Sequence, residues 1–343
     1  MKVKNLLGKL SIIALMAVAA QSCKKENGID NNNVIQRPYA LYVSDSTGNI
    51  YKTNDGNNYK TIFPGDGNPL RAITTSKQNL VFVKGMTVFL STNEGKTFNP
   101  IKQTLVQVPS GIRWQNFILD IPQLNRLYIS NTLGIIGKIS QSPQNGVYFE
   151  LDTSYTEVDT PYLVESFAFT NNQILYGYSS SGSKFGVSKF FYKAGKDAKW
   201  KPMVTDLPSP HSFYLTAWGN KIVATDYDGV KGALHSSDTG KTFVAFTGLP
   251  SAKLLSTYSA HDKLLVGTQG NGIYLYDGAT FVPSNSGIDA KTSVYGIVAK
   301  DNYYKNKATK KFFYIATNTG IYKSEDLAKS WIKVKTGDYR LIN

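Results

Sequence analysis

One octet, repeated along the chain, constrains the fold of this sequence more than any other feature. Its clearest copy, Ser236–Phe243, reads S-S-D-T-G-K-T-F and lies between two stretches rich in strand-forming residues. The carboxylate and hydroxyls of such a segment can accept hydrogen bonds from backbone N–H groups within a turn, and its glycine can adopt a positive φ. Further copies, closer or more distant, are Ser91–Phe98, Lys52–Tyr59, Ser324–Trp331, Tyr274–Phe281, Ser140–Phe149 and Lys193–Trp200.

The spacing of these copies predicts the architecture. Successive closing aromatic residues are 38 to 51 residues apart, which is typical of one four-stranded propeller blade and not of a helical repeat. We therefore expect an all-β, seven-bladed propeller of four-stranded antiparallel blades, with the octet as the turn before the last strand of each blade. In Lys52–Tyr59 we expect Asn54 to take the place of the acid, and Ala328 replaces the glycine of Ser324–Trp331.

The octets resemble the Asp-box, or bacterial neuraminidase repeat, family of β-propellers, and the resemblance covers residues 39–343. The resemblance implies a propeller related to sialidases or to the photosystem II stability factor. Propellers of the second type bind protein partners and are not enzymes. The first blade lacks its innermost strand at the start of the domain. We expect Asp338–Asn343 to supply that strand and to close the ring.

The N-terminal sequence predicts that the protein is attached to a membrane. Three lysines precede the apolar run Leu10–Ala20, which is too short to span a membrane and is followed by Cys23, the only cysteine of the chain. This arrangement resembles a lipoprotein signal of the Bacteroidetes type, in which the cysteine becomes lipidated. We expect a signal peptide at 1–22, a flexible tether at 23–38 and the propeller at 39–343. The resemblance implies an outer membrane lipoprotein, and Lys24 and Lys25 leave periplasmic or cell-surface exposure open.

The sequence does not indicate a catalytic set, a metal site or a cofactor. The resemblance to sialidases implies an arginine cluster for a carboxylate, but the chain has five arginines and only Arg71 and Arg113 are expected to face the channel. Other glycosidases need two carboxylates across the scissile bond, and the acids here show no such pairing. The segment Asp226–Gly229 lacks the further ligands of a calcium loop, so we interpret it as a turn.

Binding is therefore the function that we predict. The net charge of +14 arises from scattered lysines without a basic block, which favours solubility or an anionic surface over nucleic acid. We expect a monomer that binds a glycan or an envelope protein and touches the membrane through its lipid only. The alternatives are a carbohydrate-active enzyme, sialidase-like or another glycoside hydrolase, and a purely structural module. The loops opposite the octets carry the candidate ligand-binding residues Arg71, Arg113, Trp114, Tyr162, Glu165, His211, Tyr214 and Tyr295.

Overall fold

The computed structural model divides the chain into two compact units. The smaller comprises Met1–Pro38 and Asn302–Lys310, and the larger comprises Tyr39–Asp301 and Lys311–Asn343. The predicted signal peptide, Cys23 and most of the predicted tether lie outside the described residues. The structure describes residues 35–76, 79–85, 87–101, 118–121, 126–129, 137–142, 146–151, 166–178, 190–195, 198–208, 213–289, 291–305 and 309–343.

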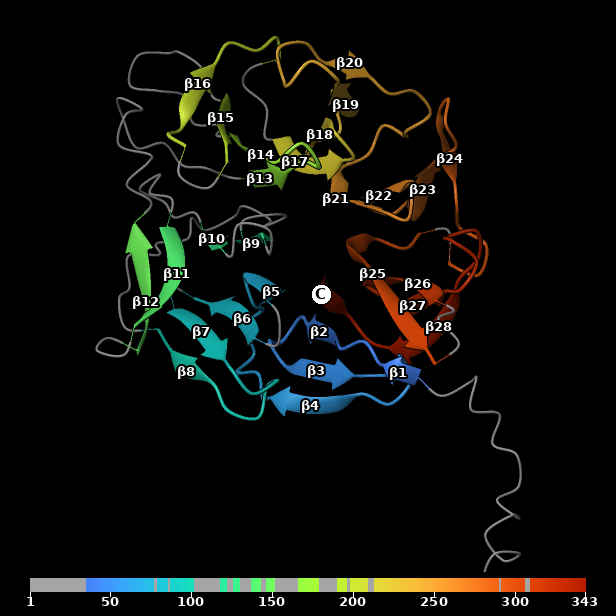
Figure 1. Ribbon diagram of the computed structural model, residues 1–343. Coiled ribbons are helices and arrows are strands. Elements are labelled where there is room, and N and C mark those ends of the chain that lie inside the picture. Colours follow the sequence, from blue (N-terminus) through green and yellow to red (C-terminus); the bar gives the residue numbers. More distant parts are fainter. Residues whose placement is uncertain are drawn as a thin grey trace, which may run out of the picture. The chain divides into compact units, whose positions relative to one another are not determined.

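The described strands form antiparallel sheets in which most neighbouring strands follow one another in sequence (Figure 1). Six of these sheets have four strands each. The first is β29 (Tyr339–Ile342), β2 (Leu41–Asp45), β3 (Ile50–Thr53) and β4 (Lys60–Phe63), and the second is β5 (Ala72–Ser76), β6 (Asn79–Lys84), β7 (Thr87–Ser91) and β8 (Asn99–Pro100). The third is β9 (Ile118–Ile121), β10 (Arg126–Ile129), β11 (Gly137–Ser142) and β12 (Gly146–Leu151), and the fourth is β13 (Ser166–Phe169), β14 (Ile174–Tyr178), β15 (Phe190–Ala194) and β16 (Lys201–Met203). The fifth is β17 (Phe213–Trp218), β18 (Lys221–Asp226), β19 (Ala233–Ser236) and β20 (Val244–Ala245), and the sixth is β21 (Leu254–Ala260), β22 (Lys263–Thr268), β23 (Ile273–Tyr276) and β24 (Phe281–Pro283).

The remaining sheet has five strands, which corrects the expectation of four strands in every blade. Its order is β1 (Ile35–Arg37), β25 (Val294–Tyr304), β26 (Thr309–Thr317), β27 (Gly320–Ser324) and β28 (Ile332–Thr336). The extra strand arises because Ile35 and Arg37, placed by the sequence in the flexible tether, pair with Tyr304 and Tyr303 of β25. The chain is thus an all-β propeller built on four-stranded antiparallel blades, as the repeats predict.

The C-terminal strand β29 belongs to the first sheet. Val43, Ser44 and Asp45 of β2 pair antiparallel with residues of β29, and the backbones of Tyr42 and Asn343 exchange hydrogen bonds of 2.7 and 2.9 Å. The end of the chain thereby provides the innermost strand that the start of the domain lacks.

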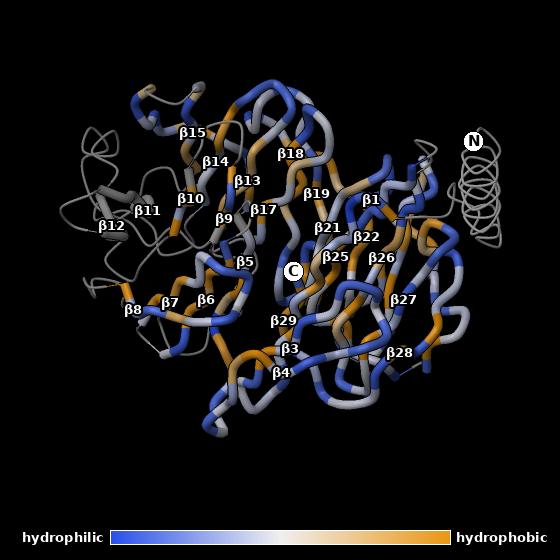
Figure 2. Tube along the Cα trace, turned by 60° about the horizontal axis from the view of Figure 1, so that its bottom comes forward, coloured by the Kyte–Doolittle hydropathy of each residue, from blue (hydrophilic) through white to orange (hydrophobic). Residues whose placement is uncertain are grey.

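Hydrophobic residues are concentrated along the strands (Figure 2), and apolar side chains of neighbouring sheets pack together within the larger unit. Strands near its centre are buried on both faces, so they read as continuous apolar runs; Leu264, Leu265 and Val266 of β22 are each at most 1% exposed. Val223 of the fifth sheet packs in one cluster with Leu264 and Val266 of the sixth. Six of the closing aromatics lie in clusters of this kind: Tyr59, Phe98, Trp200, Phe243, Phe281 and Trp331.

The octets form turns with a shared hydrogen-bond pattern. In the clearest copy, Ser236 Oγ donates to Asp238 Oδ1 at 2.7 Å and accepts the Gly240 N–H at 2.8 Å, while the Thr242 N–H donates to Asp238 Oδ1 at 3.0 Å. Asn93 takes the place of the acid in the second copy and accepts the Thr97 N–H at 2.9 Å.

The turn of the first sheet corrects a sequence prediction. Asp55, and not Asn54, takes the place of the acid, because Thr53 provides the hydroxyl and the loop is one residue shorter. Asp55 Oδ1 accepts the Thr53 hydroxyl at 2.7 Å and the Asn58 N–H at 2.9 Å.

Candidate functional site

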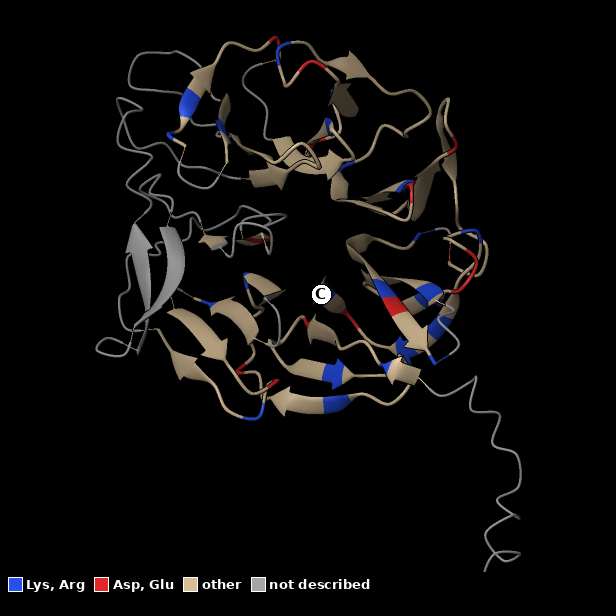
Figure 3. Ribbon diagram, in the orientation of Figure 1, with Lys and Arg blue, Asp and Glu red and all other residues tan. Residues whose placement is uncertain are grey.

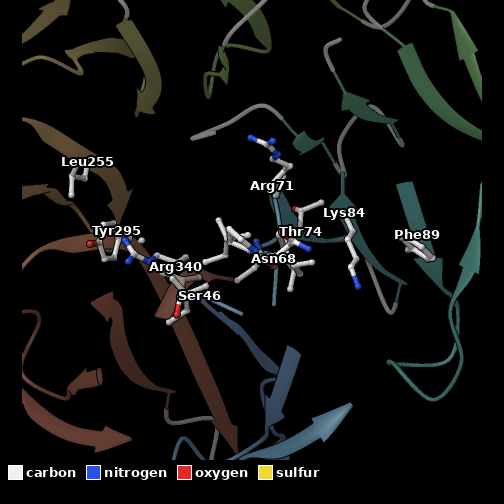
Figure 4. Close-up of a pocket in the computed structure, with 18 of the residues that line it drawn as sticks. Ser46, Asn68, Arg71, Thr74, Lys84, Phe89, Leu255, Tyr295 and Arg340 are labelled. Atoms are coloured by element: carbon white, nitrogen blue, oxygen red, sulfur yellow. The ribbon is translucent and has the colours of Figure 1, made fainter. Parts of the chain in front are cut away.

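A cavity of about 1060 Å³ lies in the larger unit and is the candidate site (Figure 4). Its walls come from the innermost strands β5, β21, β25 and β29 and from the turn between β6 and β7. Leu255 and Ile297, which are 2% and 6% exposed, contribute apolar wall, and Thr74 and Thr257 contribute hydroxyls. A large cavity with apolar walls and a few converging polar groups is the usual form of a binding site.

Arg71 is the cation of this cavity that has no partner among the described residues. It directly precedes β5, where its backbone N–H donates to the Val83 carbonyl at 2.8 Å. That bond fixes the backbone, while the half-buried side chain extends into the cavity (Figure 4). A guanidinium in this setting can bind a planar carboxylate through two parallel hydrogen bonds.

Arg340 and Tyr295 form a stacked pair on another wall of the cavity (Figure 4). The guanidinium carbon of Arg340 lies 4.2 Å from the centroid of the Tyr295 ring, and Arg340 Nη2 donates to Asp338 Oδ2 at 2.6 Å. The stacking and the ion pair fix the orientation of the guanidinium in advance of binding. Oδ1 of Asp338 is buried and has no hydrogen-bond partner among the residues that the structure describes.

Lys84 and Asp66 form an ion pair at the edge of the cavity. Lys84 Nζ lies 3.0 Å from Asp66 Oδ2 and 5.1 Å from the centroid of the Phe63 ring. The hydrogen bond from Lys84 and that from the Asn68 N–H hold the pKa of Asp66 below its usual value. Lys84 extends in the opposite direction from Arg71, so the two cations serve different parts of the cavity (Figure 4).

The structure brings two of the predicted site residues together in this cavity, Arg71 and Tyr295. Tyr214 does not line it: this side chain is 2% exposed within the fifth sheet, where its ring packs edge-on against Tyr227 at 5.8 Å. The remaining candidates lie outside the described residues: Cys23, Arg113, Trp114, Tyr162, Glu165 and His211.

Sequence reasoning missed Arg340 and Lys84 as cavity residues. Arg340 lies in Asp338–Asn343, the segment predicted to supply the innermost strand of the first sheet. The innermost strand of a blade borders the central axis, so Arg340 could have been predicted as a site residue. Lys84 ends an apolar strand and resembles many other surface lysines of the chain, so nothing in the sequence distinguishes it.

The acids considered for other chemistry have structural partners in the described parts of the chain. Asp226 is fully buried and accepts the N–H groups of Asp228 and Lys231 at 3.3 and 2.8 Å, as in a turn.

Over the described residues, no group of three histidine, cysteine or acidic side chains could hold a metal ion. In the same part of the chain, no helix has the length and apolar character required to cross a membrane. Lysines and arginines are spread over several sheets (Figure 3).

No family model matches this chain, and no curated protein is similar to it in sequence. Among solved structures it is similar to PorZ, an essential surface component of the type-IX secretion system of Porphyromonas gingivalis, with a TM-score of 0.57 and 14% identity over 87% of this chain and 37% of that one. It is also similar to YCF48 bound to D1 peptide, with a TM-score of 0.55 and 12% identity over 83% of this chain and 89% of the other.

A third similar structure is the extracellular domain of BT4673 from B. thetaiotaomicron, with a TM-score of 0.51 and 13% identity over 84% of this chain and 40% of that one. The chain thus spans less than half the length of the PorZ and BT4673 chains. At these identities the likeness shows the propeller fold and nothing more specific.

Proposed function

We propose that this protein is a lipid-anchored propeller of the cell envelope that binds a protein or glycan partner without catalysing a reaction. The observation that supports this most is the cavity of about 1060 Å³, lined by the stacked Arg340–Tyr295 pair and by Arg71, which has no side-chain partner in the described part of the chain. Two guanidinium groups on apolar and hydroxyl-bearing walls suit an extended segment that carries acidic groups.

The geometry favours a peptide among the partners of this proposal. Arg340 and Tyr295 offer a surface on which a side chain or peptide plane can stack. Arg71 offers guanidinium donors that no described side chain engages. YCF48, whose propeller has the same fold, has been solved with a bound peptide. This likeness supports the choice of a peptide as the first probe.

We also propose that the propeller is a closed ring of seven blades, with Asp-box turns and with β29 as the closing strand. One apolar cluster supports closure: Leu41 and Val43 of the first sheet pack there with Tyr314 and Ala316 of β26 in the last. The antiparallel pairing of β29 with β2 supports it as well. A closed ring would hold the walls of the cavity in fixed positions.

The proposal is tested by the charge preference of peptide binding. Fluorescent peptide libraries of equal length, rich either in Asp and Glu or in Lys, serve as probes in anisotropy titrations. We expect the acidic library to bind more tightly, with an affinity that falls as salt rises, and Arg71→Gln to weaken binding about 10- to 100-fold. Lys231→Gln, which removes an exposed charge away from the cavity, is the matched control.

Two results would contradict the proposal. Equal affinity for the acidic and basic libraries, or equal losses in the Arg71 and Lys231 variants, would remove the cavity as the binding site. Release of sugar from glycan substrates, abolished by Asp66→Asn, would instead support the carbohydrate-active enzyme, since Asp66 is the carboxylate among the described residues of the cavity.

A further inference from the structure

In the smaller unit, Ile35–Arg37 of β1 lie beside Tyr303 and Tyr304 at the end of β25, and Lys305 directly follows that strand. Ile35 pairs with Tyr304, and Arg37 pairs with Tyr303. Ile35 is 40% exposed and Tyr303 is 47% exposed, although apolar side chains of this size are usually covered. We call these six residues the basic ribbon.

The charges of the basic ribbon have one sign. Arg37 and Lys305 are both exposed. The sequence of residues 302–311, N-Y-Y-K-N-K-A-T-K-K, contains four lysines and no acid. Tyrosine rings, an isoleucine and cations side by side match the boundary between acyl chains and headgroups, where tyrosine concentrates and anionic lipids attract lysine and arginine.

The short segment between Cys23 and β1 also favours a contact between the basic ribbon and the membrane. Eleven residues, 24–34, separate Cys23 from β1. A chain of this length spans at most roughly 40 Å when fully extended. A lipid on Cys23 would therefore keep the basic ribbon within reach of the bilayer.

We propose that the basic ribbon is a second membrane contact, which binds the anionic surface of the bilayer that holds the anchor. This inference rests on the proposed lipid anchor for its location. The affinity of the ribbon for anionic lipid does not depend on acylation, so the two proposals can fail separately. The ribbon and the lipid would together attach the protein at two points.

The test is vesicle flotation of the full-length chain that carries Cys23→Ser, which cannot be acylated at that position. We expect it to float with vesicles of equal parts phosphatidylglycerol and phosphatidylcholine, to float less in high salt, and to bind phosphatidylcholine alone weakly. The double variant Arg37→Gln and Lys305→Gln should bind anionic vesicles about 10- to 30-fold less tightly. Adding Tyr303→Ser should weaken binding further.

The matched control is the double variant Lys201→Gln and Lys231→Gln, which removes two exposed charges of the larger unit. Equal losses in the two double variants, or equal binding to neutral and anionic vesicles, would overturn the proposal. A doubled mass in sedimentation without vesicles, lost in the ribbon variant, would show that a second copy of the chain covers the ribbon and would overturn it too. Mass spectrometry of the mature wild-type N-terminus reports separately on acylation of Cys23.

Discussion

At the scale of single residues, Asp238 organises the turn in which it lies. Its Oδ1 accepts the backbone N–H groups of Lys241 and Thr242, and its Oδ2 accepts the Thr242 hydroxyl at 2.7 Å. The hydrogen bonds from Thr242, followed by that from Ser236, hold the pKa of Asp238 well below its usual value. Burial raises the pKa of the equivalent Asp326, but hydrogen bonds from Ser330, Ser324 and Lys329 outweigh it and lower the pKa to about 2.

The replacement Asp238→Asn should remove a pH-dependent part of the stability. Asn93 already holds the second octet turn, so an amide oxygen can accept the same bonds, and we expect a loss of about 1 kcal/mol or less at neutral pH. The pKa of Asp238 is lower in the folded state than in the unfolded state, so the ionised carboxylate stabilises the folded protein at neutral pH. This stabilisation is lost as the pH falls below about 4, the pKa of an aspartate in the unfolded chain. The difference between wild type and variant in urea unfolding should therefore shrink from pH 5 to pH 2. A difference that stays constant over this range would contradict the account.

At the scale of elements, the octet turn depends on a glycine that also lies against the neighbouring sheet. Gly240 has a φ of 96°, and a Cβ at this position would lie 2.5 Å from Cε1 of Phe190. Gly219 has a φ of 63° in the turn between β17 and β18, but a Cβ there would meet nothing within 4 Å. Both glycines have a positive φ, but only at Gly240 would a Cβ contact a neighbouring side chain.

Gly240→Ala should therefore destabilise the protein more than Gly219→Ala does. The control change should cost about 1 kcal/mol, because alanine disfavours positive φ, and its restriction of the unfolded chain offsets only part of that cost. Gly240→Ala adds the clash with Phe190, so we expect about 2–4 kcal/mol. Chemical denaturation of both variants measures the difference. Equal losses would show that the contact with the fourth sheet relaxes without cost.

The repeats allowed the elements to be predicted better than the details of their turns. Serine, acid and aromatic at fixed spacing are a local signal, and the turns at Ser91, Ser236 and Ser324 form as expected. The assignment of Asn54 was wrong because loop length decides which side chain reaches the N–H groups, and Asp55 reaches them in the shorter loop. The extra strand β1 could not be foreseen, since its three residues show no strand pattern until β25 pairs with them.

The site was less predictable than the fold, for a physical reason. Arg71 and Tyr295 are predicted as site residues because they belong to the loops opposite the octets, and both line the cavity. Tyr214 has a similar position in its blade, yet it packs against Tyr227, because inner strands are buried on both faces. Which aromatic side chain reaches the cavity depends on how adjacent blades pack, and one sequence does not encode that locally.

At the scale of the whole molecule, β29 connects the last residues to the first sheet and to the cavity. Tyr339 is 3% exposed, and its ring packs edge-on against Tyr51 at 6.0 Å. Lys335 Nζ lies 4.7 Å from the centroid of the Tyr51 ring and 5.9 Å from that of the Tyr339 ring. The same strand carries Arg340, so strand pairing and the site share one element.

Deletion of Asp338–Asn343 should destabilise the first sheet and remove binding together. Loss of the pairing to β2 and of the buried Tyr339 should cost at least about 4 kcal/mol and speed hydrogen exchange at Leu41–Asp45. Arg340→Gln, which keeps the strand, should weaken binding of acidic peptides and leave the urea midpoint nearly unchanged. A deletion variant with the wild-type midpoint and exchange rates would show that β29 does not support the sheet.

The pairing of β2 with β29 also has a consequence for how a new molecule is made. Nearly the entire chain is synthesised between these two strands, which takes about 15–60 s at ordinary elongation rates. During that time the nascent N-terminal segment presents Leu41, Tyr42 and Val43 on an unsatisfied edge that can recruit strands from other polypeptides. Until β29 has been synthesised and pairs with β2, any factor that shields this edge would limit such intermolecular pairing.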